Sequence, residues 1–124
     1  MYIGIDLGGT NIAAGIVDDQ GNIILKGSVP TLRERGNDAI VADMAALSIK
    51  LIAEAGLSAS DIKAVGIGCP GTIDNERGVV VYSNNIVMEN YPIVENFRKY
   101  LANNHKYIQN RVMNYIKRNI EQFY

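Results

Sequence analysis

Residues 2–17 read YIGIDLGGTNIAAGIV, and this stretch decides the fold class. Its first part, residues 2–7, is rich in β-branched and apolar side chains, so it predicts a strand that the Gly8-Gly9 pair then ends. Residues 11–17 have the same character and predict a second strand. Two strands joined by so short a turn predict an antiparallel hairpin.

The pattern continues after this hairpin. A polar turn at residues 18–22 leads to residues 23–28, which predict a third strand and extend the hairpin into a meander. Between Asn37 and Ala55, apolar side chains recur at steps of three and four, which predicts a helix that Gly56 ends. These apolar positions are Ile40, Val41, Met44, Leu47, Leu51 and Ile52.

Shorter elements complete the predicted order. Ala64–Gly68 is wholly apolar, as in a strand buried on both faces, and residues 79–82 predict another strand. Pro92 stands at a plausible first helical position and opens a helix through about Ala102. The fold class is therefore α/β, a mixed sheet with an antiparallel β-meander followed by αβ units, plus a C-terminal helix within residues 104–124.

Composition limits the class of protein. The chain has 124 residues, 12 Lys and Arg against 13 Asp and Glu, and no apolar run near the ~20 residues of a membrane span. No signal-like segment opens it, so a cytoplasmic location is expected. The single Cys69 cannot form an internal disulfide and is interpreted as an inert buried thiol, and no Cys/His cluster has the spacing of zinc ligands.

The glycine turn has the chemistry of a phosphate site. Because it lies between two predicted strands, it matches neither a P-loop nor a dinucleotide fold, whose glycines lead into a helix. Without Cβ atoms, Gly8 and Gly9 let backbone N–H groups approach phosphate oxygens, and Thr10 adds a hydroxyl. Asp6 could hold Mg²⁺ through water. The alternative from these residues alone is a tight turn with a solvated or capping Asp6.

A second motif follows about 55 residues later. Residues 66–74 read GIGCPGTID and residues 78–85 read GVVVYSNN. Together with the DLGGTN turn, these motifs resemble the N-terminal lobe of the ROK family of repressors, uncharacterised reading frames and sugar kinases. The resemblance runs from Tyr2 to about Leu101. It implies that residues 1–103 form a ribonuclease-H-like (actin-like ATPase) lobe of an ATP-dependent, glucokinase-like hexose kinase.

The resemblance also implies site residues and ligands. ATP and Mg²⁺ are the expected cofactors, and the residues expected at the ATP phosphates and the metal are Asp6, Gly8, Gly9, Thr10 and Asn11. The residues expected at the hexose are Pro70, Gly71, Thr72, Asn84 and Asn85. An Asn amide both donates and accepts, as sugar hydroxyls require. The alternative for the Asn84-Asn85 pair is an ordinary polar turn.

The sequence departs from the family pattern after the second helix. Family members carry an Asn-Asp motif there, whose Asp takes the proton from the sugar hydroxyl, whereas residues 103–111 read NNHKYIQNR. No residue matches that base, and His105 is interpreted as an exposed helix-start residue. The second lobe and the family's zinc cluster are also missing, so we expect this chain alone to be catalytically incomplete.

Residues 104–124 differ in composition from the rest. They carry four basic residues against one acidic residue, with an apolar stripe at helical spacing formed by Ile108, Val112, Ile116, Ile120 and Phe123. We interpret them as a non-family helical tail, arising by truncation, frameshift or fusion. Packing on its own domain or on a second copy, as a homodimer or other self-association, is favoured over nucleic acid because the charge is modest.

Two other functions remain open. A sugar-sensing, non-catalytic regulator of the same family is disfavoured because Met1 lies only five residues before Asp6, which leaves no DNA-binding domain ahead of the turn. A self-associating structural module is the other alternative.

Overall fold

The computed structural model describes residues 1–102, so the predictions for His105 and for the tail lie outside the described residues. The elements in chain order are β1 Tyr2–Leu7, β2 Asn11–Val17, β3 Ile23–Pro30, the 3-10 turn η1 Arg33–Arg35, α1 Asn37–Glu54, η2 Ala59–Asp61, β4 Ala64–Gly68, β5 Thr72–Asp74, β6 Val79–Ser83, β7 Met88–Tyr91 and α2 Ile93–Ala102.

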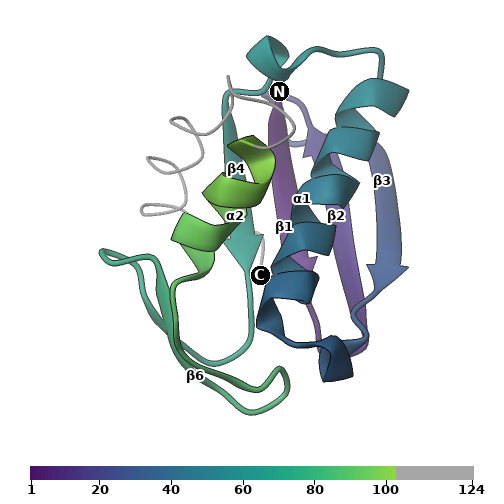
Figure 1. Cartoon of the computed structure of the whole chain (residues 1–124). Helices are drawn as coiled ribbons and strands as arrows, with labels where there is room; N and C mark the ends of the chain where they lie inside the picture. The colour runs from purple at the N-terminus through teal and green to yellow at the C-terminus, as the bar shows by residue number, and fades with distance from the viewer. Residues whose placement is uncertain (103–124) are drawn as a thin grey trace.

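The main sheet has four strands in the order β3-β2-β1-β4. β1 pairs with β2 and β2 pairs with β3 in antiparallel fashion, whereas β1 and β4 run parallel. Both helices, α1 and α2, cover the same face of this sheet (Figure 1). The mixed sheet, the meander and the α/β class predicted from the sequence are confirmed.

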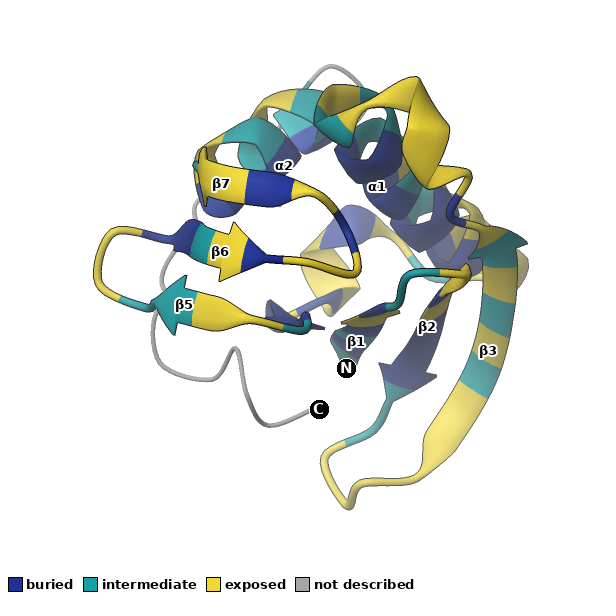
Figure 2. Cartoon of the chain, turned by 90° about the horizontal axis from the view of Figure 1, so that it is seen from below, coloured by how far each residue is buried: buried dark blue, intermediate teal, exposed yellow. Residues whose placement is uncertain are grey.

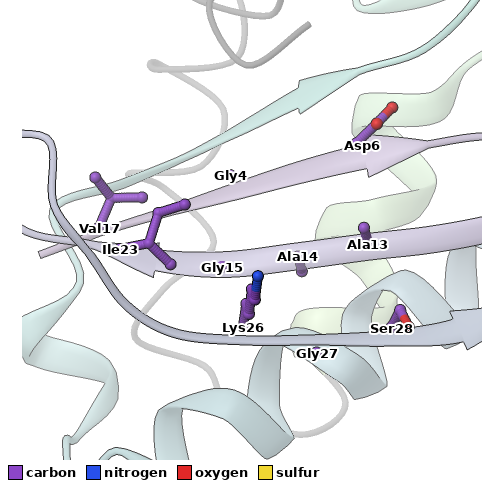
Figure 3. A pocket seen from close by; sticks show the side chains of 10 residues that line it. All are labelled: Gly4, Asp6, Ala13, Ala14, Gly15, Val17, Ile23, Lys26, Gly27 and Ser28. Atoms are coloured by element: carbon purple, nitrogen blue, oxygen red, sulfur yellow. The ribbon is translucent and has the colours of Figure 1, made fainter.

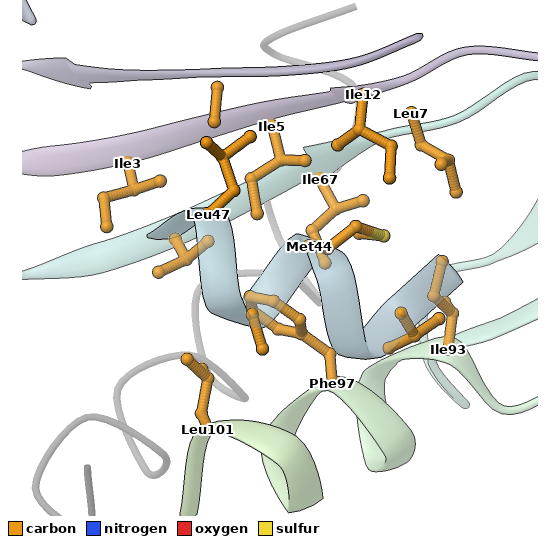
Figure 4. Packing of buried hydrophobic residues seen from close by; sticks show 14 of the residues in the cluster. Ile3, Ile5, Leu7, Ile12, Met44, Leu47, Ile67, Ile93, Phe97 and Leu101 are labelled. Carbon is orange, nitrogen blue, oxygen red and sulfur yellow. The ribbon is translucent and has the colours of Figure 1, made fainter. Parts of the chain in front are cut away.

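The core lies between that face and the two helices. Ile3, Ile5 and Leu7 alternate along β1 and are fully buried, because they point toward the helices (Figure 4). Met44 of α1 and Phe97 of α2 are also fully buried and pack into the same cluster. Burial of each such side chain stabilises the fold by about 1.5–3 kcal/mol.

The other face of the sheet is not covered by any element of residues 1–102 (Figure 2). A shallow hollow of about 590 Å³ lies on strands β1, β2 and β3, and small residues such as Gly4, Ala13 and Gly15 line it (Figure 3). The hollow exists because these positions carry little or no side chain.

A second sheet, in the order β5-β6-β7, was not predicted in full. The sequence predicted only a strand at residues 79–82, but Thr72 pairs with Tyr82 and Ser83 pairs with Met88. The outer strands have three and four residues, too few to display a hydrophobic period. They exist because β6 offers a hydrogen-bonding edge on both sides.

The ends of the helices follow from local chemistry. α1 ends where expected, with Gly56 in the left-handed region at φ +70° and the N–H of Leu57 donating to the carbonyl of Ile52. The prediction for Pro92 was one position wrong. α2 begins at Ile93, and the Pro92 carbonyl accepts the N–H of Asn96 at 3.1 Å, so Pro92 occupies the N-cap position.

Candidate functional site

The two sequence motifs meet at one end of the main sheet. β1 and β4 are parallel neighbours, and Asp6 near the end of β1 is in register with Gly68 at the end of β4. The turn that follows β1 and the loop that follows β4 therefore leave the sheet side by side. Ligands of open α/β sheets bind outside such carboxyl ends.

Two hydrogen bonds from buried Thr31 fix the glycine turn. Its hydroxyl donates to the carbonyl oxygen of Gly8 at 2.7 Å, and its N–H donates to the carbonyl oxygen of Thr10 at 2.9 Å. Thr31 is fully buried. Thr31 was not predicted from the sequence, since a Thr after a Pro carries no local signal. With both carbonyls bound to Thr31, the shape of the turn is constrained from two sides.

The turn leaves two backbone donors available. The N–H of Gly8 donates to the carbonyl oxygen of Asn11 at 3.0 Å. Within residues 1–102, the N–H groups of Gly9 and Thr10 make no backbone hydrogen bond. Adjacent free N–H groups in a turn form a small anion-binding concavity. Gly9 and Thr10 are therefore the backbone donors of the turn that remain available to a ligand.

Gly8 and Gly9 differ in how much space the structure leaves for a side chain. A Cβ atom on Gly8 would lie 2.9 Å from the carbonyl oxygen of Asn11, so the closure of the turn itself requires glycine there. A Cβ atom on Gly9 would meet nothing nearer than the carbonyl oxygen of Asn85 at 3.5 Å, an ordinary contact, and neither glycine has a positive φ. The packing of the chain does not require glycine at position 9.

A pocket of about 440 Å³ opens beside Gly9. Three separate segments line it, namely the β1–β2 turn, the η1 region and the β6–β7 turn, through Gly9, Thr10, Leu32, Arg33, Glu34 and Asn85. Nη1 of Arg33 donates to the carbonyl oxygen of Asn85 at 2.9 Å and so joins two of these segments. The first motif and the Asn84-Asn85 turn thus share one polar pocket.

Asp6 lies at the end of β1 on the uncovered face of the sheet, where it lines the hollow on that face (Figure 3). Its carboxylate is exposed and has no hydrogen bond or ion pair with another described residue. No three His, Cys, Asp or Glu side chains gather into a metal site in residues 1–102. One free carboxylate close in sequence to a phosphate turn still fits Mg²⁺, which uses few protein carboxylates together with phosphate oxygens and water.

The second motif is shaped by close backbone packing. Gly71 has φ +113°, and a Cβ atom there would collide with the carbonyl oxygen of Tyr82. Thr72 pairs with the same residue, so Pro70, Gly71 and Thr72 run against the strand that leads into the exposed Asn84-Asn85 turn. The structure therefore brings the two expected sugar-site segments, residues 70–72 and the Asn84-Asn85 turn, together at one small sheet.

A second contact fixes the small sheet to helix α1. The hydroxyl of Tyr91, in β7, donates to Oδ1 of Asp38 at the start of α1 at 2.7 Å. Burial and the neighbouring carboxylate both raise the pKa of Tyr91, so the hydroxyl keeps its proton. Cys69 is buried as expected, and burial raises the pKa of its thiol to about 12, which makes it a poor nucleophile.

Comparison with known proteins agrees with the motifs. The family model described as "ROK family" matches residues 2–112, so the match extends into residues 104–124, which were interpreted from the sequence as a non-family tail. A glucokinase from Thermotoga maritima is 39% identical over 101 residues, which cover 78% of this chain and 29% of that enzyme. The chain thus spans less than a third of this relative.

None of the described helices is long and apolar enough to cross a membrane.

Solved structures give the same picture. A ROK hexokinase from Thermus thermophilus is similar with a TM-score of 0.70 at 33% identity, covering 82% of this chain and 32% of that one. A ROK family glucokinase from Streptomyces griseus, solved with glucose and AMPPNP, has a TM-score of 0.71 at 32% identity, covering 82% and 30%. The described fold is that of the sugar-kinase structures of this actin-like ATPase class.

Proposed function

Since the chain belongs to the ROK family, we propose that it forms the N-terminal lobe of an ATP-dependent hexose kinase of the glucokinase type. Glucokinases and an N-acetyl-D-glucosamine kinase are each 39% identical to this chain, which supports a hexose kinase. The glucokinase type is supported further by one similar structure, which was solved with glucose and an ATP analogue. The chain spans about 30% of those proteins, so the proposal concerns the ligand-facing surface of one lobe. A cytoplasmic location, where ATP is available, fits this role.

The shared pocket is the observation that carries the proposal. A kinase must bring a phosphate and a hydroxyl acceptor together, and here the glycine turn and the Asn84-Asn85 turn line one cavity. Transfer of a phosphoryl group depends mainly on positioning and on stabilisation of charge. Two ligand-binding segments held at contact distance by Arg33 provide the positioning part.

The phosphate side of the pocket is assigned to the first motif. The N–H groups of Gly9 and Thr10 and the hydroxyl of Thr10 bind phosphate oxygens, and Asn11 continues the turn at the start of β2. Gly8 contributes the shape of the turn. Asp6, at the end of β1 on the uncovered face, would hold Mg²⁺ through water, and the ion would supply positive charge to the phosphate oxygens.

The sugar side is assigned to the second motif. Asn84 and Asn85 are exposed, and their amides offer the mixed donors and acceptors that hexose hydroxyls need. Pro70, Gly71 and Thr72 border the hexose from the neighbouring strand. The small sheet therefore presents the sugar and the main sheet presents the phosphates.

Catalysis is assigned to residues outside this lobe. Residues 103–111 hold no Asn-Asp pair to supply the general base, and a single lobe cannot enclose the reacting groups in a dry site. We therefore propose that the ROK-type lobe spans residues 1–103, that residues 104–124 form the tail, and that the chain alone binds ligands without turning them over.

Nuclear magnetic resonance titration of the chain tests this function. Mg·ATP is expected to shift the amide signals of Gly9 and Thr10, and glucose those of Asn84 and Asn85. Asn84→Ala should weaken the glucose response, while the matched control Asn22→Ala, in the distant β2–β3 turn, should leave it unchanged. Shifts with glucose but none with Mg·ATP would instead support the sugar-sensing regulator.

A further inference from the structure

Arg33 is a cationic residue in the shared pocket, and the proposed function gives its charge no role. It lies in η1, a segment that the sequence analysis did not assign to any site, yet it lines the pocket together with Gly9, Thr10 and Asn85. Its Nη1 atom donates to the carbonyl oxygen of Asn85, a residue 52 positions away. A guanidinium carries five N–H donors, so one anchoring bond leaves most of them for a ligand.

The charge of Arg33 is not neutralised by another described residue. Arg35, two positions on, pairs with Asp43 at 2.7 Å, and Arg77 pairs with Asp74 at 2.6 Å. Arg33 makes no ion pair within residues 1–102, although Glu34 lines the same pocket. An anchored guanidinium that faces a pocket without a carboxylate partner is suited to bind an anion, because its planar fork matches phosphate oxygens.

The position of Arg33 selects which phosphate it meets. It stands between the glycine turn and the Asn84-Asn85 turn, and a Cβ atom on Gly9 would lie 3.9 Å from Nη1 of Arg33. In the proposed kinase, the first turn binds the phosphate chain and the second binds the sugar. A phosphate held between the two turns would be the terminal one, because that is the phosphate transferred to the sugar hydroxyl.

We propose that Arg33 binds the terminal phosphate of the nucleotide and aligns it with the sugar side of the pocket. This assignment rests on the proposed kinase function. It adds a fixed positive charge where the transferred group carries most of its negative charge. The hydrogen bond to Asn85 has a second consequence, because it sets the distance between the phosphate and sugar subsites.

Two substitutions separate charge from structure. Arg33→Gln removes the charge, but its amide nitrogen lies two bonds nearer the backbone than Nη1, so the ligand-free signals of the Asn84-Asn85 turn must report whether the turn keeps its position. Arg33→Lys keeps the charge but loses the planar fork. Arg77→Gln is the matched control, since Arg77 is an exposed arginine in the β5–β6 turn, away from the pocket. Unfolding midpoints and the amide signals of the Asn84-Asn85 turn, measured without ligand, report whether each variant keeps its fold.

The decisive comparison is between Mg·ATP and Mg·ADP, followed at the amides of Gly9 and Thr10. Arg33→Gln is expected to weaken Mg·ATP binding about tenfold, the size of one charge-assisted hydrogen bond at an exposed site, and to leave Mg·ADP binding nearly unchanged. Arg33→Lys should give a smaller loss, and Arg77→Gln none. The loss should shrink as salt is added.

The outcomes distinguish this inference from the function on which it rests. Equal weakening of Mg·ATP and Mg·ADP, or no change in Arg33→Gln, would overturn the role of Arg33 and leave the kinase proposal standing, provided the wild-type chain binds Mg·ATP at Gly9 and Thr10. No response of those two amides to millimolar Mg·ATP in the wild-type chain would overturn the phosphate pocket itself and, with it, the role of Arg33.

Discussion

Replacing Thr31 with valine removes the hydrogen bond that holds the glycine turn while keeping the shape of the side chain. Thr31 is fully buried, and its hydroxyl reaches the carbonyl oxygen of Gly8 at 2.7 Å. Loss of a buried neutral hydrogen bond that leaves one partner unsatisfied costs about 1–2 kcal/mol. The bond from the Thr31 N–H to Thr10 survives the change, so the strand pairing next to the turn should remain.

Urea unfolding of the full chain, followed by circular dichroism, measures this cost. With a slope of roughly 1–1.5 kcal/mol/M for a domain of this size, Thr31→Val should lower the midpoint by about 1 M. The control Thr31→Ser keeps the hydroxyl and loses one methyl group, so it should cost only about 0.8 kcal/mol. A Val variant as stable as the wild type, or more stable than the Ser variant, would refute the view that the hydroxyl holds the turn. The Val variant should also bind Mg·ATP more weakly than the Ser variant.

Four further outcomes are expected. Gly8→Ala should lower the melting temperature because its Cβ atom meets the carbonyl of Asn11, whereas Gly9→Ala should fold normally and lose Mg·ATP affinity in a titration. Cys69 should resist a thiol reagent at pH 8 until the chain is unfolded. Because burial raises the pKa of its thiol from 9.0 to about 12 in the folded chain, its contribution to stability is present below pH 9 and is lost as the pH rises toward 12. Unfolding of the wild type and of Cys69→Ala at several pH values will check this. The chain alone, given Mg·ATP and hexoses, should form no sugar phosphate above background in a coupled assay, and robust turnover would mean that another residue replaces the missing base. Light scattering should find self-association at micromolar concentration, reduced by Ile24→Lys, because Ile24 is 50% exposed on edge strand β3; a wild-type monomer would contradict this.

The regular elements were predictable because their signals are local. The apolar period between Asn37 and Ala55 identified α1 to within one residue of its end, and the wholly apolar Ala64–Gly68 identified β4 with its bounds. β5 and β7 were missed, because strands of three and four residues have no period of their own. Pro92 was misplaced by one position, since fixed φ suits both the N-cap and the first helical residue.

For the candidate site, the sequence supplied the residue types but not the connections between them. Gly9, Thr10 and Asn85 were named from motifs and do line one pocket. Thr31 and Arg33 were not named, although one holds the turn and the other joins it to the sugar side. Their roles are side-chain bonds to backbone atoms of distant segments, and such bonds leave no periodic or compositional trace.

By itself, the sequence determined the two helices and the longer strands β1, β2, β3, β4 and β6, because side-chain branching, apolar spacing and glycine act over a few residues. Tertiary structure alone decided that β4 lies parallel to β1. This pairing places Gly68 beside Asp6 and brings the two motifs together at the carboxyl ends of these strands. It also decided the separation of Asp6 from the pocket at Gly9, since alternation along β1 turns Asp6 to the uncovered face. Contacts of this kind depend on the burial of the shared core, which forms only when all the elements pack together.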